Sequence, residues 1–273
     1  MTAPAPSLAR RATWAERLGP RAVRVLPPLV VLVVTLVLWQ VSAGQEPGRI
    51  VPAPSLIVAA AADNSGLLFR SALATFIEAL GGLAIGTLAG LAVAFAAARF
   101  VVARDVLLGL AVGAAAIPLI AAAPILNNWF GLINPLSKML MAALLVFFPV
   151  MISVTRGLVE VSPGSLELMR SYAVSETEVL RKVRIPNMLP YFFTALKVGT
   201  TLAFIGAIVA EYFGGTSEVL GRVVINSMFS GKFPLAWAGI LIAALAAISA
   251  YLVVSLVERL AIPWYIALRG GEA

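Results

Sequence analysis

The chain has 273 residues, of which 61% are apolar and only 12% are charged. Globular domains have about 45–50% apolar and about 25% charged residues, so this composition excludes an ordinary water-soluble fold and indicates an all-α, polytopic membrane protein. The chain has no cysteine and no histidine, which excludes disulfides, thiolate metal sites and a Ser/His/Asp catalytic set.

The net charge of +7 is compatible with a nucleic-acid partner or with membrane topology. The basic residues lie between apolar runs, where Lys and Arg set the orientation of a membrane protein. No basic patch is interleaved with aromatic residues. We therefore expect a lipid bilayer, and no nucleic acid, around this chain.

Apolar runs long enough to cross a bilayer, at about 20 residues each, recur about six times along the chain. They cover residues 25–43, 71–98, 106–126, 138–155, 192–212 and 235–256. The basic segment 1–24 and the first run, which ends in Val-Ser-Ala-Gly, resemble either a cleaved signal peptide or a retained first span. The long basic region and the five later runs favour a retained span, so residues 25–273 are expected to form one transmembrane domain.

Lys and Arg are distributed unequally between the two sides of these spans. If the N-terminus lies inside, the outer segments hold only five basic residues, namely Arg49, Arg70, Lys138, Arg222 and Lys232. The positive-inside rule then places both termini in the cytoplasm. The segment between the fourth and fifth spans, residues 156–190, is therefore expected to be cytoplasmic.

The second span combines a small-residue face with an acidic side chain. Gly82, Gly86 and Gly90 follow small-xxx-small spacing, which allows a neighbouring helix to approach closely. That helix belongs either to the same bundle or to a second subunit, and the former is the more ordinary arrangement. Glu78 requires a polar partner on a neighbouring span, because intramembrane carboxylates face protein or water.

Polar residues also mark the outer ends of the third and fifth spans. Asn127, Asn128 and Trp129 form either a polar interface with an aromatic anchor or an outer gate whose amides touch a polar solute. Glu211 ends the fifth span. It either lines the translocation path near the outer mouth or serves in packing or in a gate.

The cytoplasmic segment 156–190 predicts two short helices. Ser162 can cap the first helix, and Ser175 with Glu178 forms a capping box for the second, after a bend near residues 173–175. Pro186 is expected to end the second helix, and Pro190 to keep the chain extended up to the fifth span. Such a helix pair lies either on lipid headgroups or against a soluble partner.

The mixture of acidic and basic side chains in this segment favours a protein partner over an anionic bilayer. The segment resembles the signature loop of binding-protein-dependent ABC importer permeases, whose pattern is Glu-Ala-Ala, three residues, Gly, nine residues, Ile-x-Leu-Pro. Glu167 stands at the Glu position and Ala173 at the Gly position, and the last three positions are Val183, Ile185 and Pro186. Because alanine disfavours left-handed backbone geometry, we expect a shallower or displaced bend.

Longer stretches extend the resemblance over most of the chain from about residue 52. PLIAAAPILNNWFG, SKMLMAALLVFFPVMISVTRGL, IGAIVAEYFGG and ERLAIPW resemble the nitrate, sulfonate and taurine branch of these permeases. The resemblance implies a type I importer permease of the bacterial inner membrane, in a dimer that is most simply a homodimer. It also implies a cytoplasmic ATPase dimer that binds ATP and Mg, and an extracytoplasmic solute-binding protein.

On this interpretation the chain is a transport subunit and not an enzyme, and it binds no cofactor itself. The sequence contains no P-loop motif, so ATP hydrolysis is expected on a separate chain. The residues expected in the loop that docks on the ATPase are Glu167, Met169, Tyr172, Ala173, Val174, Ser175, Glu176 and Pro186.

Two other functions remain open at this point, a secondary transporter that works without an ATPase and a membrane scaffold. A secondary transporter would show ion-coupling carboxylates near the midplane and a repeat between halves, and the sequence offers only Glu78 for the former. The solute is expected to be small and polar. The Asn pair and the nearby Trp129, Phe130 and Phe148 favour a planar, neutral vitamin precursor or heterocycle over a nitrate-like or sulfonate-like anion.

Overall fold

The computed structural model of the chain describes residues 20–44, 46, 48–99, 109 and 119–265. Every regular element in these ranges is helical. In chain order they are α2 (Pro20–Ala43), α3 (Pro54–Asp63), α4 (Ser65–Arg99), the 3₁₀ turn η1 (Leu119–Ala121), α6 (Ala122–Phe130), α7 (Pro135–Val159), α8 (Pro163–Ser171), α9 (Glu176–Val179), the π-helical turn η2 (Leu180–Arg184), α10 (Ile185–Phe213), α11 (Leu220–Phe229) and α12 (Phe233–Ala261).

Among the described residues, five helices are long and apolar enough to cross a membrane: α2, α4, α7, α12 and the continuous helix Glu176–Phe213, which includes α10. They coincide with five of the six predicted spans and confirm the all-α fold class. The predicted third span, 106–126, lies for the most part outside the described residues, and its last residues form the start of α6.

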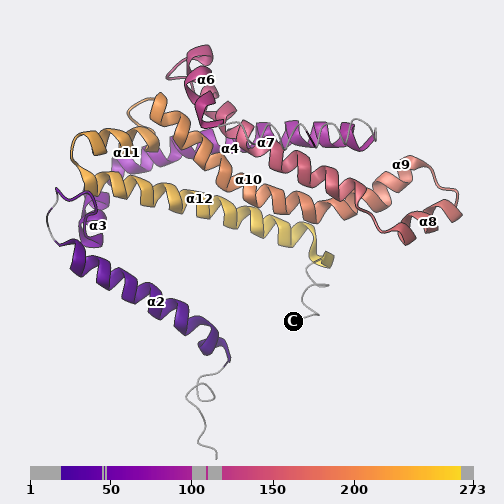
Figure 1. The fold of residues 1–273 in the computed structure, drawn as a ribbon, viewed down its shortest axis with the longest axis horizontal. Coiled ribbons are helices and arrows are strands. Elements are labelled where there is room, and N and C mark those ends of the chain that lie inside the picture. Colours follow the sequence, from indigo (N-terminus) through magenta and orange to yellow (C-terminus); the bar gives the residue numbers. More distant parts are fainter. Residues whose placement is uncertain (1–19, 45, 47, 100–108, 110–118, 266–273) are drawn as a thin grey trace, which may run out of the picture.

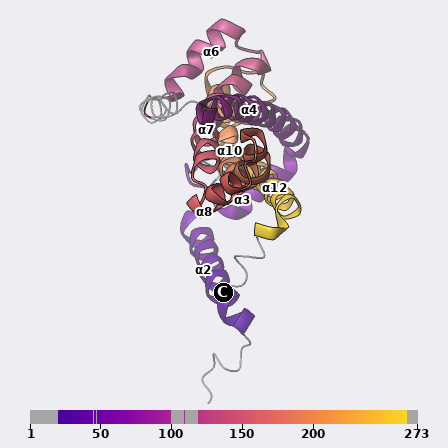
Figure 2. The ribbon, with the colours of Figure 1, turned by 90° about the vertical axis from the view of Figure 1, so that its right-hand side faces the viewer.

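The core of the bundle is built from α4, α7 and α10. Figure 2 shows these three helices gathered at the centre, with α2 leading away from them. α7 packs against both α4 and α10, and its Val146, Val150 and Val154 are fully buried between them. α12 lies along α10 and α11, and most of its surface, like that of α2, is apolar and exposed, as suits a helix in lipid.

Glycines permit the close packing on both sides of α7. A Cβ atom on Gly82 would lie 2.6 Å from the carbonyl oxygen of Met139, and one on Gly86 would lie 2.5 Å from that of Ala143. A Cβ atom on Gly90 would lie 3.0 Å from the carbonyl oxygen of Phe147. The small-residue face that the sequence shows therefore packs within the same chain. On the other side of α7, Gly206 allows α10 a similar approach.

The prediction that the chain is extended between Pro186 and Pro190 is wrong. α10 begins at Ile185 and continues through both prolines to Phe213. Pro186 lies in the first turn, where no intrahelical N–H is needed, and the wide π turn η2 precedes it. Pro190 removes one hydrogen bond from the second turn, and the burial of this apolar helix in the bundle outweighs that loss.

The packing of α4 on α7 predicts that Gly86→Ala destabilises the protein. The new methyl group would meet the α7 backbone, which cannot move aside as a side chain can, so we expect a loss of about 1–3 kcal/mol in the free energy of unfolding. Gly66→Ala is the matched control on the same helix, because only the end of the Arg70 side chain lies near the added atom. Thermal unfolding in detergent should show a lower midpoint for Gly86→Ala alone, and equal midpoints would contradict the role of Gly86.

Candidate functional site

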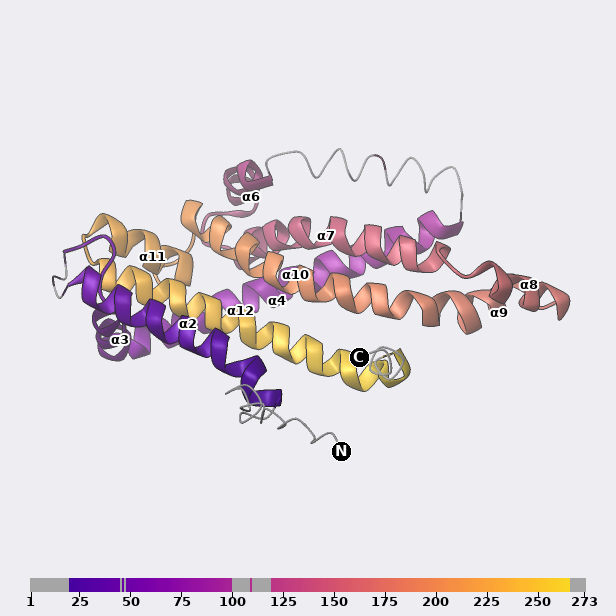
Figure 3. The same cartoon turned by 60° about the horizontal axis from the view of Figure 1, so that its bottom comes forward.

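Two short helices, α8 and α9, project beyond the end of the bundle (Figures 1 and 3). Residues 163–179, here called the projecting helix pair, connect α7 to η2 and α10. No residue of α8 is buried, and the side chains of Leu168 and Tyr172 are 56% and 71% exposed. The pair therefore offers large apolar groups on a surface outside the apolar bundle.

Local hydrogen bonds fix both helices of the pair at their N-termini. The Ser162 side chain accepts from the backbone N–H of Ser165 at 3.3 Å. Ser175 and Glu178 form the predicted capping box. Lys182 donates to Glu178 at 3.1 Å. The predicted caps and the break between the helices are thus present.

The bend between α8 and α9 has the geometry that glycine normally provides. Ala173 adopts φ +49°, the only positive φ of a non-glycine residue in the described part of the chain. The N–H of Ala173 donates to Arg170 O and that of Val174 to Met169 O, which is the hydrogen-bond pattern of a Schellman motif. The expectation of a shallower or displaced bend is therefore wrong. These two hydrogen bonds offset the strain of left-handed alanine.

Asn187 fastens the base of the projecting helix pair to α7. Its side-chain amide donates to Gly157 O at 2.8 Å and to Glu160 O at 3.1 Å. Arg184 donates to Leu158 O at 3.5 Å. These carbonyls belong to the C-terminal end of α7, where helical carbonyls lack intrahelical donors. Sequence reasoning missed Asn187, although a polar residue directly after the Ile-Pro signature was a signal for it.

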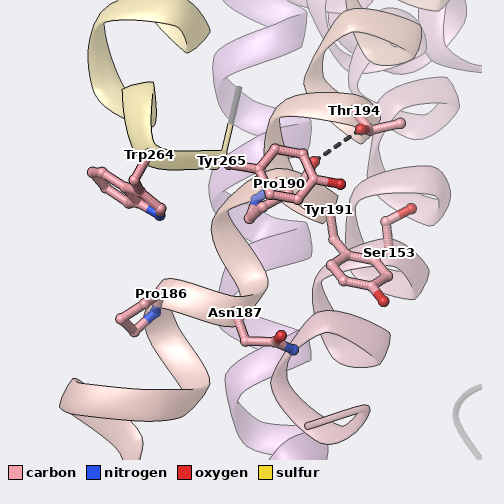
Figure 4. Close-up of a pocket in the computed structure, with 8 residues that line it drawn as sticks. All are labelled: Ser153, Pro186, Asn187, Pro190, Tyr191, Thr194, Trp264 and Tyr265. Carbon is pink, nitrogen blue, oxygen red and sulfur yellow. Dashed lines mark hydrogen bonds between the residues drawn. The ribbon is translucent and has the colours of Figure 1, made fainter. Parts of the chain in front are cut away.

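A pocket of about 510 Å³ opens beside this base. Figure 4 shows Trp264 and Tyr265, from the segment after α12, across from Pro190 and Tyr191 of α10. The Thr194 hydroxyl donates to the Pro190 carbonyl at 2.8 Å. The pocket joins α7, α10 and the segment after α12, so its shape depends on how these three parts pack together. It is lined by Ser153, Pro186, Asn187, Pro190, Tyr191, Thr194, Trp264 and Tyr265.

The polar residues predicted at the outer gate do not form one group. Asn127 is buried, and its side-chain amide donates to Ala210 O at 3.0 Å. Asn128 and Trp129 are exposed on α6, with Trp129 at 73%. Glu211 lies next to Ala210 in α10 and is fully buried. The structure therefore brings Asn127 and Glu211 to the same end of α10 and separates them from Asn128 and Trp129.

Glu211 and Thr75 hold the N-terminus of α11. Oε2 of Glu211 accepts from the backbone N–H of Gly221 at 2.6 Å, and the Thr75 hydroxyl accepts from that of Leu220 at 3.0 Å. The first N–H groups of a helix have no intrahelical acceptor, and a carboxylate there also complements the helix dipole. α11 is thereby attached to both α10 and α4 at the end of the bundle opposite the projecting helix pair (Figure 1).

Glu78, Lys138 and Glu211, from α4, α7 and α10, form a charged cluster inside the bundle. All three side chains are buried. Glu78 and Glu211 are in hydrogen-bonding reach of one another, and Lys138 acts electrostatically on both. The ammonium group of Lys138 donates to the carbonyls of Leu132 and Asn134. The structure thus supplies the polar partner that the sequence requires for Glu78.

Sequence reasoning missed Lys138 as a member of this cluster, because its place near the end of a span predicts an interfacial position. No group of three or more His, Cys, Asp or Glu side chains that could hold a metal ion occurs among the described residues.

Comparison with known proteins gives consistent matches. Residues 82–265 match the family described as "Binding-protein-dependent transport system inner membrane component". A probable ABC transporter permease protein of Haemophilus influenzae is 34% identical over 81% of this chain and 90% of its own length. A riboflavin transport system permease protein of Chloroflexus aurantiacus is 31% identical over 86% and 88%. A formylaminopyrimidine transport permease protein of Halalkalibacterium halodurans is 29% identical over 89% and 98%.

Permeases named for aliphatic sulfonates and taurine, from Bacillus subtilis and Escherichia coli, also match. They are 28 to 30% identical over 54 to 86% of each chain.

The left-handed Ala173 predicts that Ala173→Gly stabilises the projecting helix pair. Glycine removes the Cβ strain, worth about 1 kcal/mol, so the amides of residues 173 and 174 should exchange with solvent about fivefold more slowly. Ser171→Gly is the control, because residue 171 is in right-handed helix and glycine there should speed exchange. Hydrogen exchange read by mass spectrometry makes the comparison, and faster exchange in Ala173→Gly would contradict the assigned geometry.

Proposed function

The chain belongs to the family of binding-protein-dependent transport system inner membrane components, and we propose that it docks its ATPase through the projecting helix pair and imports a small, planar, neutral heterocycle. Permeases of this family are non-catalytic, multi-pass proteins of the inner membrane that work with an ATPase and a binding protein. The proposal concerns the docking residues, the arrangement in the membrane and the solute.

The exposure of large apolar side chains on the projecting helix pair is the observation that supports this docking role. Leu168 and Tyr172 are largely exposed on a helix with no buried residue. Glu167 and Glu176 lie among basic residues on the same pair, which suits a protein surface better than an anionic lipid surface. A groove on the ATPase that covers α8 would bury the apolar groups and pair the charges.

In this proposal the projecting helix pair lies in the cytoplasm, and so do both termini. Two copies of the chain form the permease, and an ATPase dimer that carries ATP and Mg binds their two helix pairs. ATP-dependent closure of the ATPases moves the pairs together. α7 and α10 follow, because Asn187 ties the start of α10 to the end of α7. ATP thereby biases an equilibrium between two states of the permease.

A neutral solute is supported by the hydrogen bonds of Lys138 and Lys197. Lys138 donates to two backbone carbonyls, and Lys197 donates to Glu258 at 2.7 Å. Each ammonium group thus already has a hydrogen-bond partner in this conformation. The relatives named for riboflavin and formylaminopyrimidine transport planar heterocycles, which agrees with this assignment. A sulfonate is the second candidate, because sulfonate permeases also match the chain.

A transporter that works without an ATPase is the alternative mechanism. It would leave the apolar surface of the projecting helix pair without a partner. The family to which the chain belongs works with an ATPase, which favours the importer.

The docking proposal predicts that Glu167→Lys weakens retention of the ATPase. Reversal of one exposed charge at a protein interface should lower the affinity about tenfold, which is about 1.4 kcal/mol, and leave membrane insertion unchanged. Glu160→Lys makes the same charge change beside α8 and should retain the ATPase. Co-purification in mild detergent measures retention. Equal retention by Glu167→Lys and the wild type would show that Glu167 does not dock the ATPase.

The solute assignment is tested with the complete importer in proteoliposomes. ATP hydrolysis stimulated by the loaded binding protein should occur with riboflavin or a formylaminopyrimidine and not with taurine or an alkanesulfonate. Stimulation by the sulfonates alone would establish the second candidate. Solute movement by this chain without any ATPase would instead support the alternative mechanism.

A further inference from the structure

The charged cluster contains two acids and one base. Glu78, Lys138 and Glu211 would together hold one negative charge in excess if all three were ionised. The partly buried ion pair of Lys197 with Glu258, in contrast, is balanced one to one. The charged cluster therefore lacks one positive charge, whereas the Lys197–Glu258 pair does not.

The position of the cluster makes an uncompensated charge costly. Glu78 is buried, with 5% of its surface exposed. Lys138 and Glu211 are fully buried. A net charge away from water loses its solvation and is costly unless it has a partner of opposite charge. The cluster is thus expected to contain one more positive charge than its side chains provide.

Among the described residues, the neighbouring elements place no further cation against the two carboxyl groups; Arg222 of α11 follows Gly221 but is partly exposed. α11 contributes backbone N–H groups of Leu220 and Gly221, and Tyr212 of α10 contributes a neutral phenol close to Glu211. Arg70 of α4 is exposed and pairs with Glu218. Among the described residues, Lys138 is the cation that acts on the two carboxyl groups.

The oxygen atoms of the two carboxyl groups indicate where the missing charge is. Oε2 of Glu78 and Oε1 of Glu211 meet no N–H or O–H donor among the described residues. Yet the two carboxyl groups are within hydrogen-bonding reach of each other. Two ionised carboxylates in this arrangement would repel one another, whereas one shared proton satisfies both. Glu211 already accepts from Gly221, so it is the better acceptor.

We propose that the permease binds one proton between Glu78 and Glu211 in this conformation, with Glu78 as the donor and Glu211 as the acceptor. The proton comes from water, and the step is a simple protonation of a carboxylate. With the proton bound, the cluster is neutral and α4 is hydrogen-bonded to α10 beside the attachment of α11. A conformation that separates the two carboxyl groups or admits water binds one proton fewer, so a rise in pH shifts the equilibrium away from the conformation described here.

Difference infrared spectroscopy of the complete complex in lipid tests the proposal. The wild type at neutral pH should show the C=O stretching band of a buried, protonated carboxyl, which shifts when H₂O is replaced by D₂O. Glu78→Gln and Glu211→Gln should each lose this band, because the remaining carboxylate is then balanced by Lys138. Lys138→Met should double it, because both acids then need a proton. Glu258→Gln, in the balanced pair, is the control and should leave the band unchanged.

The measurement on the wild type needs no variant, so a variant that fails to fold leaves the test intact. Absence of the band at neutral pH would overturn the proposal. If the thermal stability of the wild type then depended on Na⁺ rather than choline at constant ionic strength, the missing charge would be a metal cation. A band that persists in both glutamine variants would place the proton elsewhere and would equally overturn it. None of these outcomes bears on ATPase docking or on the solute, which are tested separately.

Discussion

The close contact between α4 and α7 is the constraint on which the rest of the structure depends. In a bilayer, apolar side chains gain little by leaving lipid, so helices associate through van der Waals packing and polar contacts. Gly82 and Gly86 let the two backbones approach to a distance that any Cβ atom would prevent. α10 then packs on the other face of α7 through Gly206. Only in such a tight three-helix core do Glu78 and Glu211 come within reach of each other.

The buried charges show two ways of placing ionisable groups in a membrane protein. Lys197 and Glu258 form a short ion pair that joins α10 to α12, and the pair is neutral by itself. The charged cluster instead has two carboxyl groups and one ammonium group, and its side chains form hydrogen bonds with backbone groups. A neutral pair joins two helices without an additional ion. An acid-rich cluster makes the attachment of α4 to α10 depend on an additional bound proton, and so on the surroundings of the site.

Features that follow from local chemistry were predictable from the sequence. Hydropathy predicted the five spans that the structure describes. The residues around Ser162 and Ser175 predicted the two helix caps, because a cap depends only on neighbours in the chain. The continuation of α10 through Pro190 and the left-handed Ala173 were not predictable. Local propensity opposes both, and packing elsewhere overrides it. Lys138 was missed for a related reason, since its partners are on helices remote in sequence.

α10 links the two functional regions of the chain. Its first residues adjoin the projecting helix pair and Asn187, and its last turn contains Glu211. A 29-residue helix is about 43 Å long and moves largely as a rigid body. The π turn and both prolines lie at or before Pro190, so none of these bending points lies between Tyr191 and Glu211. A tilt of this part of α10 therefore changes the separation of Glu211 from Glu78 at the far end. Because the proton and the attachment of α11 both depend on that separation, a movement at one end of α10 has a defined chemical consequence at the other.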